Sequence, residues 1–254
     1  MFEKDSPHFA ISHGSADMCR VAFGLGIPII STADSPHATA ANKLGLPLVD
    51  YLVVSEAFPK KLYQRYGVRD IVQFKGVDEV AWVRGYKPVK LHYERPLIVV
   101  RQTETKAAYS QDKEDVTLEI AKELTTLGNV VFISRYERRP RKGLIVPQEF
   151  VDSVSLSARA DLIISVGGTI SREAALQGTP SIVVNTFGTS YVNDYLSKLG
   201  FPLFTVEPSQ VIKLARRQIG QRWDVKRLLG QLENPVDYVE KIIREDSKNA
   251  QLAI

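Results

Sequence analysis

Short apolar runs alternate along the chain with longer stretches in which apolar residues recur every three or four positions. The runs are typical of buried strands, and the longer stretches are typical of amphipathic helices. In residues 112–127, for example, Val116, Ile120, Leu124 and Leu127 fall on one face of a helix. Strands that alternate with helices in this way predict parallel sheets with helices on their faces.

The predicted strands are residues 9–12, 27–31, 51–55, 71–74, 97–101, 130–134, 161–166, 181–185 and 203–206. The predicted helices are 16–25, 38–43, 56–66, 112–127, 150–160, 191–199, 209–218 and 236–244, with one more between the glycines at 168 and 178. Residues 85–96 show little periodicity and are interpreted as a linker. We therefore expect a first domain at 1–88, a second at 89–230 and a C-terminal helical segment at 231–254.

Composition narrows the class of protein. Hydrophobic residues make up 44% and charged residues 24%, which is typical of a globular chain, and a net charge of +4 does not suggest a nucleic-acid binder. The single cysteine cannot form an internal disulfide, and the four histidines show no metal-ligand spacing. No apolar run is long enough to span a bilayer, and the N-terminus lacks an apolar signal core. We expect a cytoplasmic protein with no metal and no cofactor.

The most informative stretch is residues 166–180, which reads as the end of a strand, a glycine turn and a helix. Gly167 and Gly168 allow a sharp turn and a close approach of a ligand, and Thr169 or Ser171 is a candidate cap for the helix. A helix that starts after such a turn directs free N–H groups and its positive dipole end outward, which suits phosphate. The alternative is a tight turn with no ligand.

Glu173 lies about one and a half turns into this helix, too deep for a simple cap. A carboxylate at that depth can reach past a bound diphosphate and accept hydrogen bonds from two ribose hydroxyls. The alternative is a surface carboxylate that pairs with Arg172 or with a solvent-exposed lysine.

The stretch resembles the nucleotide-sugar motif in the C-terminal domain of GT-B glycosyltransferases and UDP-GlcNAc 2-epimerases. Its form is nearest to that of the lipid-linked GlcNAc transferase of peptidoglycan synthesis, with Gly167, Gly168 and Glu173 on the motif positions. The whole chain resembles an uncharacterised, largely archaeal family related to these enzymes, through residues 11–15, 34–38 and 167–180. The resemblance implies an α/β fold of two Rossmann-like domains in a GT-B arrangement.

The resemblance also implies that the N-terminal domain is truncated. A GT-B N-terminal domain has two or three strand–helix units before the equivalent of Phe9, and the last helix of such proteins often crosses back onto that domain. Exposed sheet edges would then favour a homo-oligomer or a partner chain that completes the domain.

Polar residues follow the strands of the first domain. His13 comes after the first strand, and Asp34 and His37 come after the second, at the ends where parallel sheets place ligands. His13 is a candidate general base, and Asp34 is a candidate for positioning His37. The alternative is that the histidines only cap backbone carbonyls in loops.

In the second domain, Arg101 and Arg135 end two strands and can meet a diphosphate or stack on a base. Asn185 and Gly188 follow the strand after the motif, where the resemblance places the donor sugar. The basic run that starts at Arg135 is also compatible with a solvated loop.

These observations predict a GT-B-like nucleotide-sugar enzyme that transfers a sugar from a UDP-sugar, or epimerises one, with no metal. Gly167, Gly168, Thr169 and Ser171 would hold the diphosphate, and Glu173 the ribose. The alternative is a non-catalytic nucleotide-sugar-binding subunit that needs a partner chain, so whether the chain is an enzyme by itself stays open.

Overall fold

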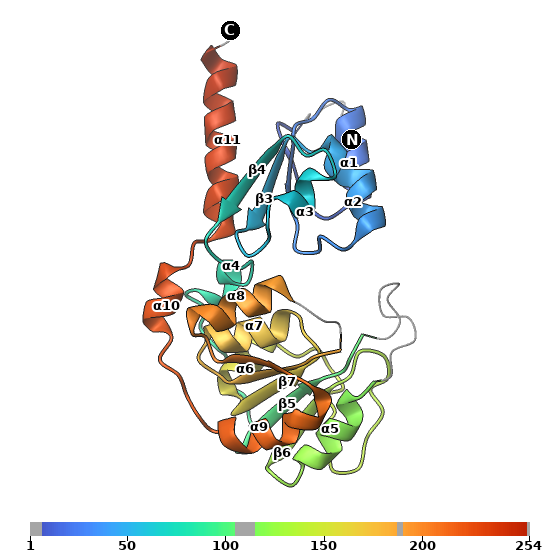
Figure 1. Cartoon of the computed structure of the whole chain (residues 1–254), viewed down its shortest axis with the longest axis vertical. Helices are drawn as coiled ribbons and strands as arrows, with labels where there is room; N and C mark the ends of the chain where they lie inside the picture. The colour runs from blue at the N-terminus through green and yellow to red at the C-terminus, as the bar shows by residue number, and fades with distance from the viewer. Residues whose placement is uncertain (1–6, 105–114, 187–189, 253–254) are drawn as a thin grey trace. The chain divides into compact units, whose positions relative to one another are not determined.

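The computed structural model describes residues 7–104, 115–186 and 190–252. Its internal contacts divide the chain into two compact units (Figure 1). Unit 1 consists of Met1–Ala81 and Leu232–Ile254, and unit 2 consists of Trp82–Gln231. Each unit contains one parallel sheet. The domain limits expected from the sequence remain predictions.

In unit 1 and at its boundary, the elements are β1 (Ala10–His13), α1 (Ala16–Gly24), β2 (Ile29–Thr32), α2 (Thr39–Gly45), η1 (Leu46–Leu48), β3 (Tyr51–Ser55), α3 (Lys61–Gln64), β4 (Asp70–Phe74), α4 (Val80–Val83) and α11 (Pro235–Leu252). In unit 2 they are β5 (Leu97–Arg101), α5 (Thr117–Leu124), β6 (Asn129–Ile133), α6 (Ser153–Arg159), β7 (Leu162–Ser165), α7 (Thr169–Leu176), β8 (Ser181–Val184), α8 (Tyr191–Leu199), β9 (Leu203–Val206), η2 (Pro208–Gln210), α9 (Val211–Gln218) and α10 (Lys226–Gln231).

The sheet of unit 1 has the strand order β1-β2-β3-β4, all parallel. The last helix, α11, packs on one face of it, where Tyr238 and Ile242 meet Val53 and Phe74 (Figure 1). Helix α1 contacts β1 and β2 through its buried side chains, Cys19 and Ala22. Helices therefore cover the sheet from both faces, as expected for alternating strands and helices.

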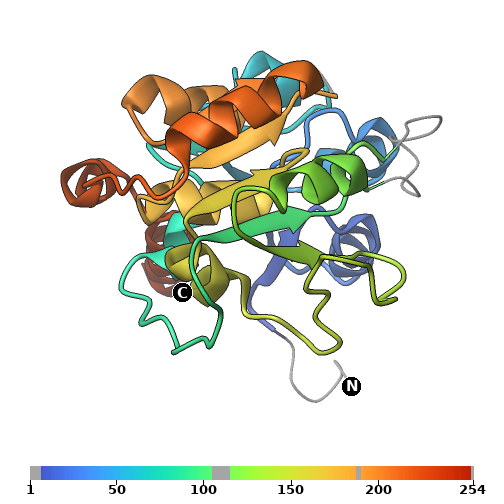
Figure 2. The ribbon, with the colours of Figure 1, turned by 90° about the horizontal axis from the view of Figure 1, so that it is seen from below.

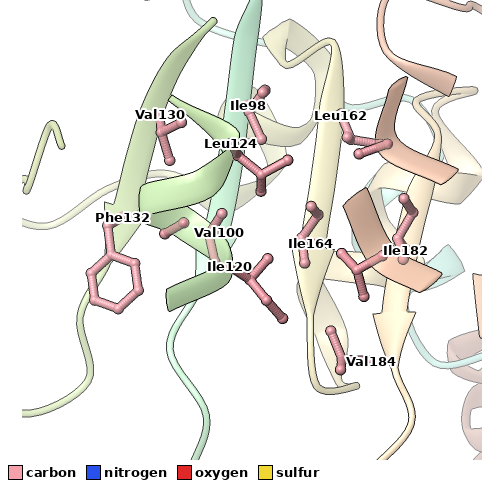
Figure 3. Packing of buried hydrophobic residues seen from close by; sticks show 13 residues of the cluster. Ile98, Val100, Ile120, Leu124, Val130, Phe132, Leu162, Ile164, Ile182 and Val184 are labelled. Atoms are coloured by element: carbon pink, nitrogen blue, oxygen red, sulfur yellow. The ribbon is translucent and has the colours of Figure 1, made fainter. Parts of the chain in front are cut away.

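The sheet of unit 2 has the order β6-β5-β7-β8-β9, again all parallel. Helices α5 and α9 lie over one face (Figure 2). Figure 3 shows Ile120 and Leu124 of α5 over strand residues that include Val100 and Ile164. Helices α6 and α7 cover the other face with residues such as Leu156. The strands are buried on both sides, which explains their continuous apolar runs.

Several predicted elements agree with the structure residue by residue, namely the strands at 51–55, 97–101 and 203–206 and the helix at 191–199. The predicted helix at 56–66 is wrong, because only Lys61–Gln64 is helical. Pro59 accounts for the late start, since proline has no N–H and disfavours helical backbone in the residue before it.

The short helices α4 and α10 were not predicted. With four and six residues, they are too short to show a helical period. The last helix runs to Leu252 instead of ending at residue 244, because no glycine or proline follows Pro235.

Gly178 lies just beyond α7, where the chain around Trp223 passes close to its backbone. Its carbonyl accepts a hydrogen bond from the Trp223 amide at 3.0 Å, so the chain after α9 runs directly past it. A Cβ built on Gly178 would lie 2.1 Å from the Trp223 carbonyl oxygen, and the residue has φ +77. No side chain fits this position without a shift of the backbone.

Gly178→Ala should therefore lower the free energy of unfolding by roughly 2–5 kcal/mol, because left-handed backbone and overpacking both add to the cost. Gly220→Ala is the matched control. Gly220 has φ +78, but a Cβ there meets nothing within 4 Å, so about 1–2 kcal/mol is expected from the backbone alone. Urea denaturation of both variants measures the difference, and equal losses would contradict the close-approach argument.

Candidate functional site

The strand order of unit 2 reverses at β5, whose neighbours are β6 on one side and β7 on the other. In open parallel sheets, ligands bind at such a switch point, beyond the carboxyl ends of the strands. Arg101 is the last residue of β5, and the Gly167-Gly168 turn follows β7. The fold thus brings two predicted site features to the same edge of one sheet.

The turn between β7 and α7 has a backbone that favours glycine. Gly167 has φ +114 and Gly168 has φ +98, and a Cβ on either would meet nothing within 4 Å. Open space therefore lies beside the turn. The hydroxyl of Ser165 accepts a hydrogen bond from the Gly167 amide at 3.0 Å and lies 2.6 Å from the Ser171 hydroxyl, which ties the turn to the first turn of α7.

The expected cap at Thr169 or Ser171 is wrong. Gly168 occupies the N-cap position of α7, and no side chain makes a capping hydrogen bond there. Thr169 is the first helical residue, and the Ser171 hydroxyl is directed at Ser165. The start of α7 is therefore not closed by a side-chain cap.

Glu173 is buried in α7, with 2% of its surface exposed. Its Oε1 atom accepts a hydrogen bond of 2.9 Å from the indole Nε1–H of Trp82. This burial does not fit a surface carboxylate paired with a solvent-exposed lysine. Trp82 lies 91 residues away along the chain, so no local sequence pattern identifies it as a neighbour of Glu173.

The two predicted arginines lie near each other at the ends of adjacent strands. Burial and then the positive charge of Arg135 lower the pKa of Arg101, while Glu104 acts in the opposite direction. Arg135 donates to the Gln102 carbonyl at 3.0 Å and forms an ion pair of 3.5 Å with Glu104. The guanidinium groups of Arg101 and Arg135 and the carboxylate of Glu104 thus lie together at this edge of the sheet.

Asn185 follows β8, and its side chain donates a hydrogen bond of 2.8 Å to Glu207. Its backbone N–H donates to the Val206 carbonyl, so Asn185 links the ends of β8 and β9. Gly188, the other residue predicted for this region, lies outside the described residues.

In unit 1, the polar residues predicted after β1 and β2 meet in part. The Nδ1 atom of His13 lies 2.7 Å from the Thr32 hydroxyl, and its Nε2 atom lies 3.7 Å from the Asp34 carboxylate. Asp34 was predicted to position His37, and the structure places it against His13. The exposed His37 lies in the turn before α2, where its carbonyl accepts from the Thr39 amide.

The surroundings of His13 are acidic. Its pKa is raised above the ordinary value of 6.5, with the interaction with Asp34 as the largest cause, burial acting against it, and the charges of Asp34, Asp78 and Glu79 adding to the rise. Asp78 and Glu79 were not singled out from the sequence. They come after the end of strand β4, whereas His13 is the last residue of β1.

Metal binding and membrane crossing can be judged for the part of the chain that the structure describes. Within it, no cluster of histidine, cysteine, aspartate or glutamate side chains has the grouping needed to hold a metal ion. None of its helices combines the length and the apolar character that crossing a membrane requires.

Comparison with known proteins agrees with the resemblance seen in the sequence. The model of a family described as "Protein of unknown function (DUF354)" matches residues 1–248. An uncharacterised protein of Methanocaldococcus jannaschii is 32% identical over 249 residues, which cover 91% of this chain and 72% of the relative.

Solved structures are similar at the level of the fold. UDP-GlcNAc 2-epimerase of M. jannaschii, in complex with UDP-GlcNAc and UDP, has a TM-score of 0.62 at 13% identity, with 97% of this chain and 77% of the other covered. The Neisseria meningitidis epimerase bound to UDP-GlcNAc gives 0.60 at 17%, covering 98% and 78%. The glycosyltransferase SnogD of Streptomyces nogalater gives 0.55 at 16%, covering 96% and 74%. The predicted α/β fold with two Rossmann-like domains of the GT-B class is confirmed, and the truncation remains a prediction.

The environment of His13 yields a test by NMR. We expect His13 to titrate above 6.5, and its pKa to move back toward 6.5 in Asp34→Asn, because the largest cause of the rise is removed. Since the folded-state pKa is raised, the stability gained from this contact is fully present below the unfolded pKa and is lost as the pH rises through the folded pKa.

Titration of the imidazole Cε1–H signals measures this pKa directly, with His92 as the internal reference because it lies in the other unit. A His13 pKa that is the same in both proteins would contradict the assigned role of Asp34.

Proposed function

This chain belongs to the DUF354 family of proteins of unknown function, and we propose that it binds a nucleotide-sugar and transfers the sugar from a UDP-sugar, or epimerises one. The observation that carries the proposal is the glycine turn at the switch point of unit 2, with open space beside it and no side-chain cap on α7. The related fold of enzymes solved with UDP-GlcNAc and UDP supports the choice of ligand.

The diphosphate would bind at the start of α7. The first N–H groups of a helix have no partner within the helix, and they carry the positive end of its dipole. Gly167 and Gly168 have no Cβ to keep a ligand away from these groups, and Thr169 is the first residue to present its amide. Arg101, on the neighbouring strand, adds positive charge at the same edge.

Glu173 would accept hydrogen bonds from the ribose hydroxyls. It lies four residues beyond Thr169, about 6 Å along the helix axis, and helical side chains lean toward the N-terminus. This lean would direct its carboxylate back toward the proposed diphosphate. Because Glu173 is 2% exposed, a ribose reaches it only when groups that cover it move.

The chemical step needs a base that takes a proton from the acceptor hydroxyl in a transfer, or from the sugar in an epimerisation. We assign this role to His13 in unit 1. Its base form increases as the pH rises through its raised pKa, so the rate should rise over the same interval. The leaving group in a transfer is a nucleoside diphosphate. The N–H groups at the start of α7 would stabilise the charge that it develops.

Thermal unfolding with a panel of ligands tests the proposal. UDP, GDP, dTDP and their sugars are each added to the wild type, to Glu173→Ala and to Glu123→Ala. A ligand at 100 times its dissociation constant adds about 2.7 kcal/mol of stability. We expect one nucleotide class to stabilise the wild type and Glu123→Ala, in which an exposed carboxylate of α5 is removed, and to stabilise Glu173→Ala much less.

A wild type that melts cooperatively and responds to none of these ligands would overturn the proposal. Stabilisation that is equal in the wild type and Glu173→Ala would remove Glu173 from the site while leaving the nucleotide in place.

A further inference from the structure

The contact between Trp82 and Glu173 joins a half-exposed indole to a buried carboxylate. Trp82 has 41% of its surface exposed and Glu173 has 2%, and the bond from Nε1 to Oε1 is 2.9 Å. A buried carboxylate needs hydrogen-bond donors to offset the loss of water, and the indole N–H is one of them. A ribose hydroxyl is a donor of the same kind.

Trp82 lies on a short helix, α4. The helix α4 has four residues, and neither a helix nor a strand is present in residues 84–96 that follow it. Val80 and Val83 of this helix are buried, with 0% and 5% of their surface exposed, so movement is limited to the indole side chain of Trp82, which can change its rotamer on the exposed side. The β7-α7 turn, in contrast, is tied down by Ser165 and Ser171. Of the two partners, Trp82 is the one that can move away.

We propose that Trp82 forms part of the ribose subsite, and that its indole N–H holds the place of a ribose hydroxyl on Glu173 until a nucleotide binds. The inference rests on the proposed function, because it requires Glu173 to be the ribose acceptor. It explains how the carboxylate is both buried in the protein and available to a ligand. Binding then exchanges an indole donor for a hydroxyl donor on the same oxygen.

The exchange predicts that a mutation in the binding site raises the affinity for the ligand, where most such mutations lower it. Trp82→Phe keeps an aromatic ring but removes the N–H, so Glu173 loses a competing donor and gains affinity for the ribose. A hydrogen bond to a charged group is worth about tenfold in an equilibrium constant. The diphosphate part of the site is not touched by this change.

The experiment is calorimetric titration of the wild type, Trp82→Phe and Trp223→Phe. The ligands are the nucleoside diphosphate that stabilises the wild type in the panel (UDP, GDP or dTDP) and inorganic pyrophosphate, which has no ribose. Trp223 is the matched control, since it is 40% exposed and its ring packs on Phe204.

We expect Trp82→Phe to bind the nucleoside diphosphate about tenfold more tightly than the wild type and to bind pyrophosphate equally well. Trp223→Phe should match the wild type for both ligands. Unchanged or weaker binding of the nucleoside diphosphate by Trp82→Phe would overturn the inference.

A second measurement covers the case in which Trp82→Phe does not fold. The chain has two tryptophans, so Trp223→Phe leaves Trp82 as the sole indole. Its emission should change with the nucleoside diphosphate and stay constant with pyrophosphate, and constant emission with both would overturn the inference. Failure of the proposed function is seen separately, as a wild type that no nucleotide stabilises, before any tryptophan variant is compared.

Discussion

The backbone of the turn between β7 and α7 is the constraint on which the rest of the candidate site depends. Two successive residues with positive φ reverse the chain at the carboxyl edge of the sheet, and only glycine adopts this conformation at low cost. The hydroxyl of Ser165 holds the turn to α7, and the close approach of the chain at Gly178 fixes the other end of that helix. The position of Glu173 follows, because it is carried on a helix held at both ends.

The two units offer different chemistry. The edge of the unit 2 sheet combines the positive end of a helix with Arg101 and Arg135, which suits an anion. In unit 1, the negative charges of Asp34, Asp78 and Glu79 raise the pKa of His13, and negative charge does not suit phosphate binding.

The sequence predicts those structural features that depend on residues close to one another along the chain. Apolar runs identify the strands at 97–101 and 203–206, and the spacing of Gly167, Gly168 and Glu173 identifies the turn and the helix behind it. It does not reveal pairs that tertiary folding creates, such as His13 with Asp34 or Trp82 with Glu173. Short helices such as α4 are missed for a related reason, since one turn contains too few residues for a period.

Burial of Glu173 is better explained by function than by stability. A carboxylate inside a helix that packs against a sheet costs free energy on folding, and an apolar side chain of similar size would pack there without needing a donor. The bond from Trp82 offsets part of that cost, but it comes from a short helix on a distant part of the chain. A carboxylate kept at such cost, four residues beyond the start of a helix that faces open space, fits the proposed role of Glu173 as the ribose acceptor.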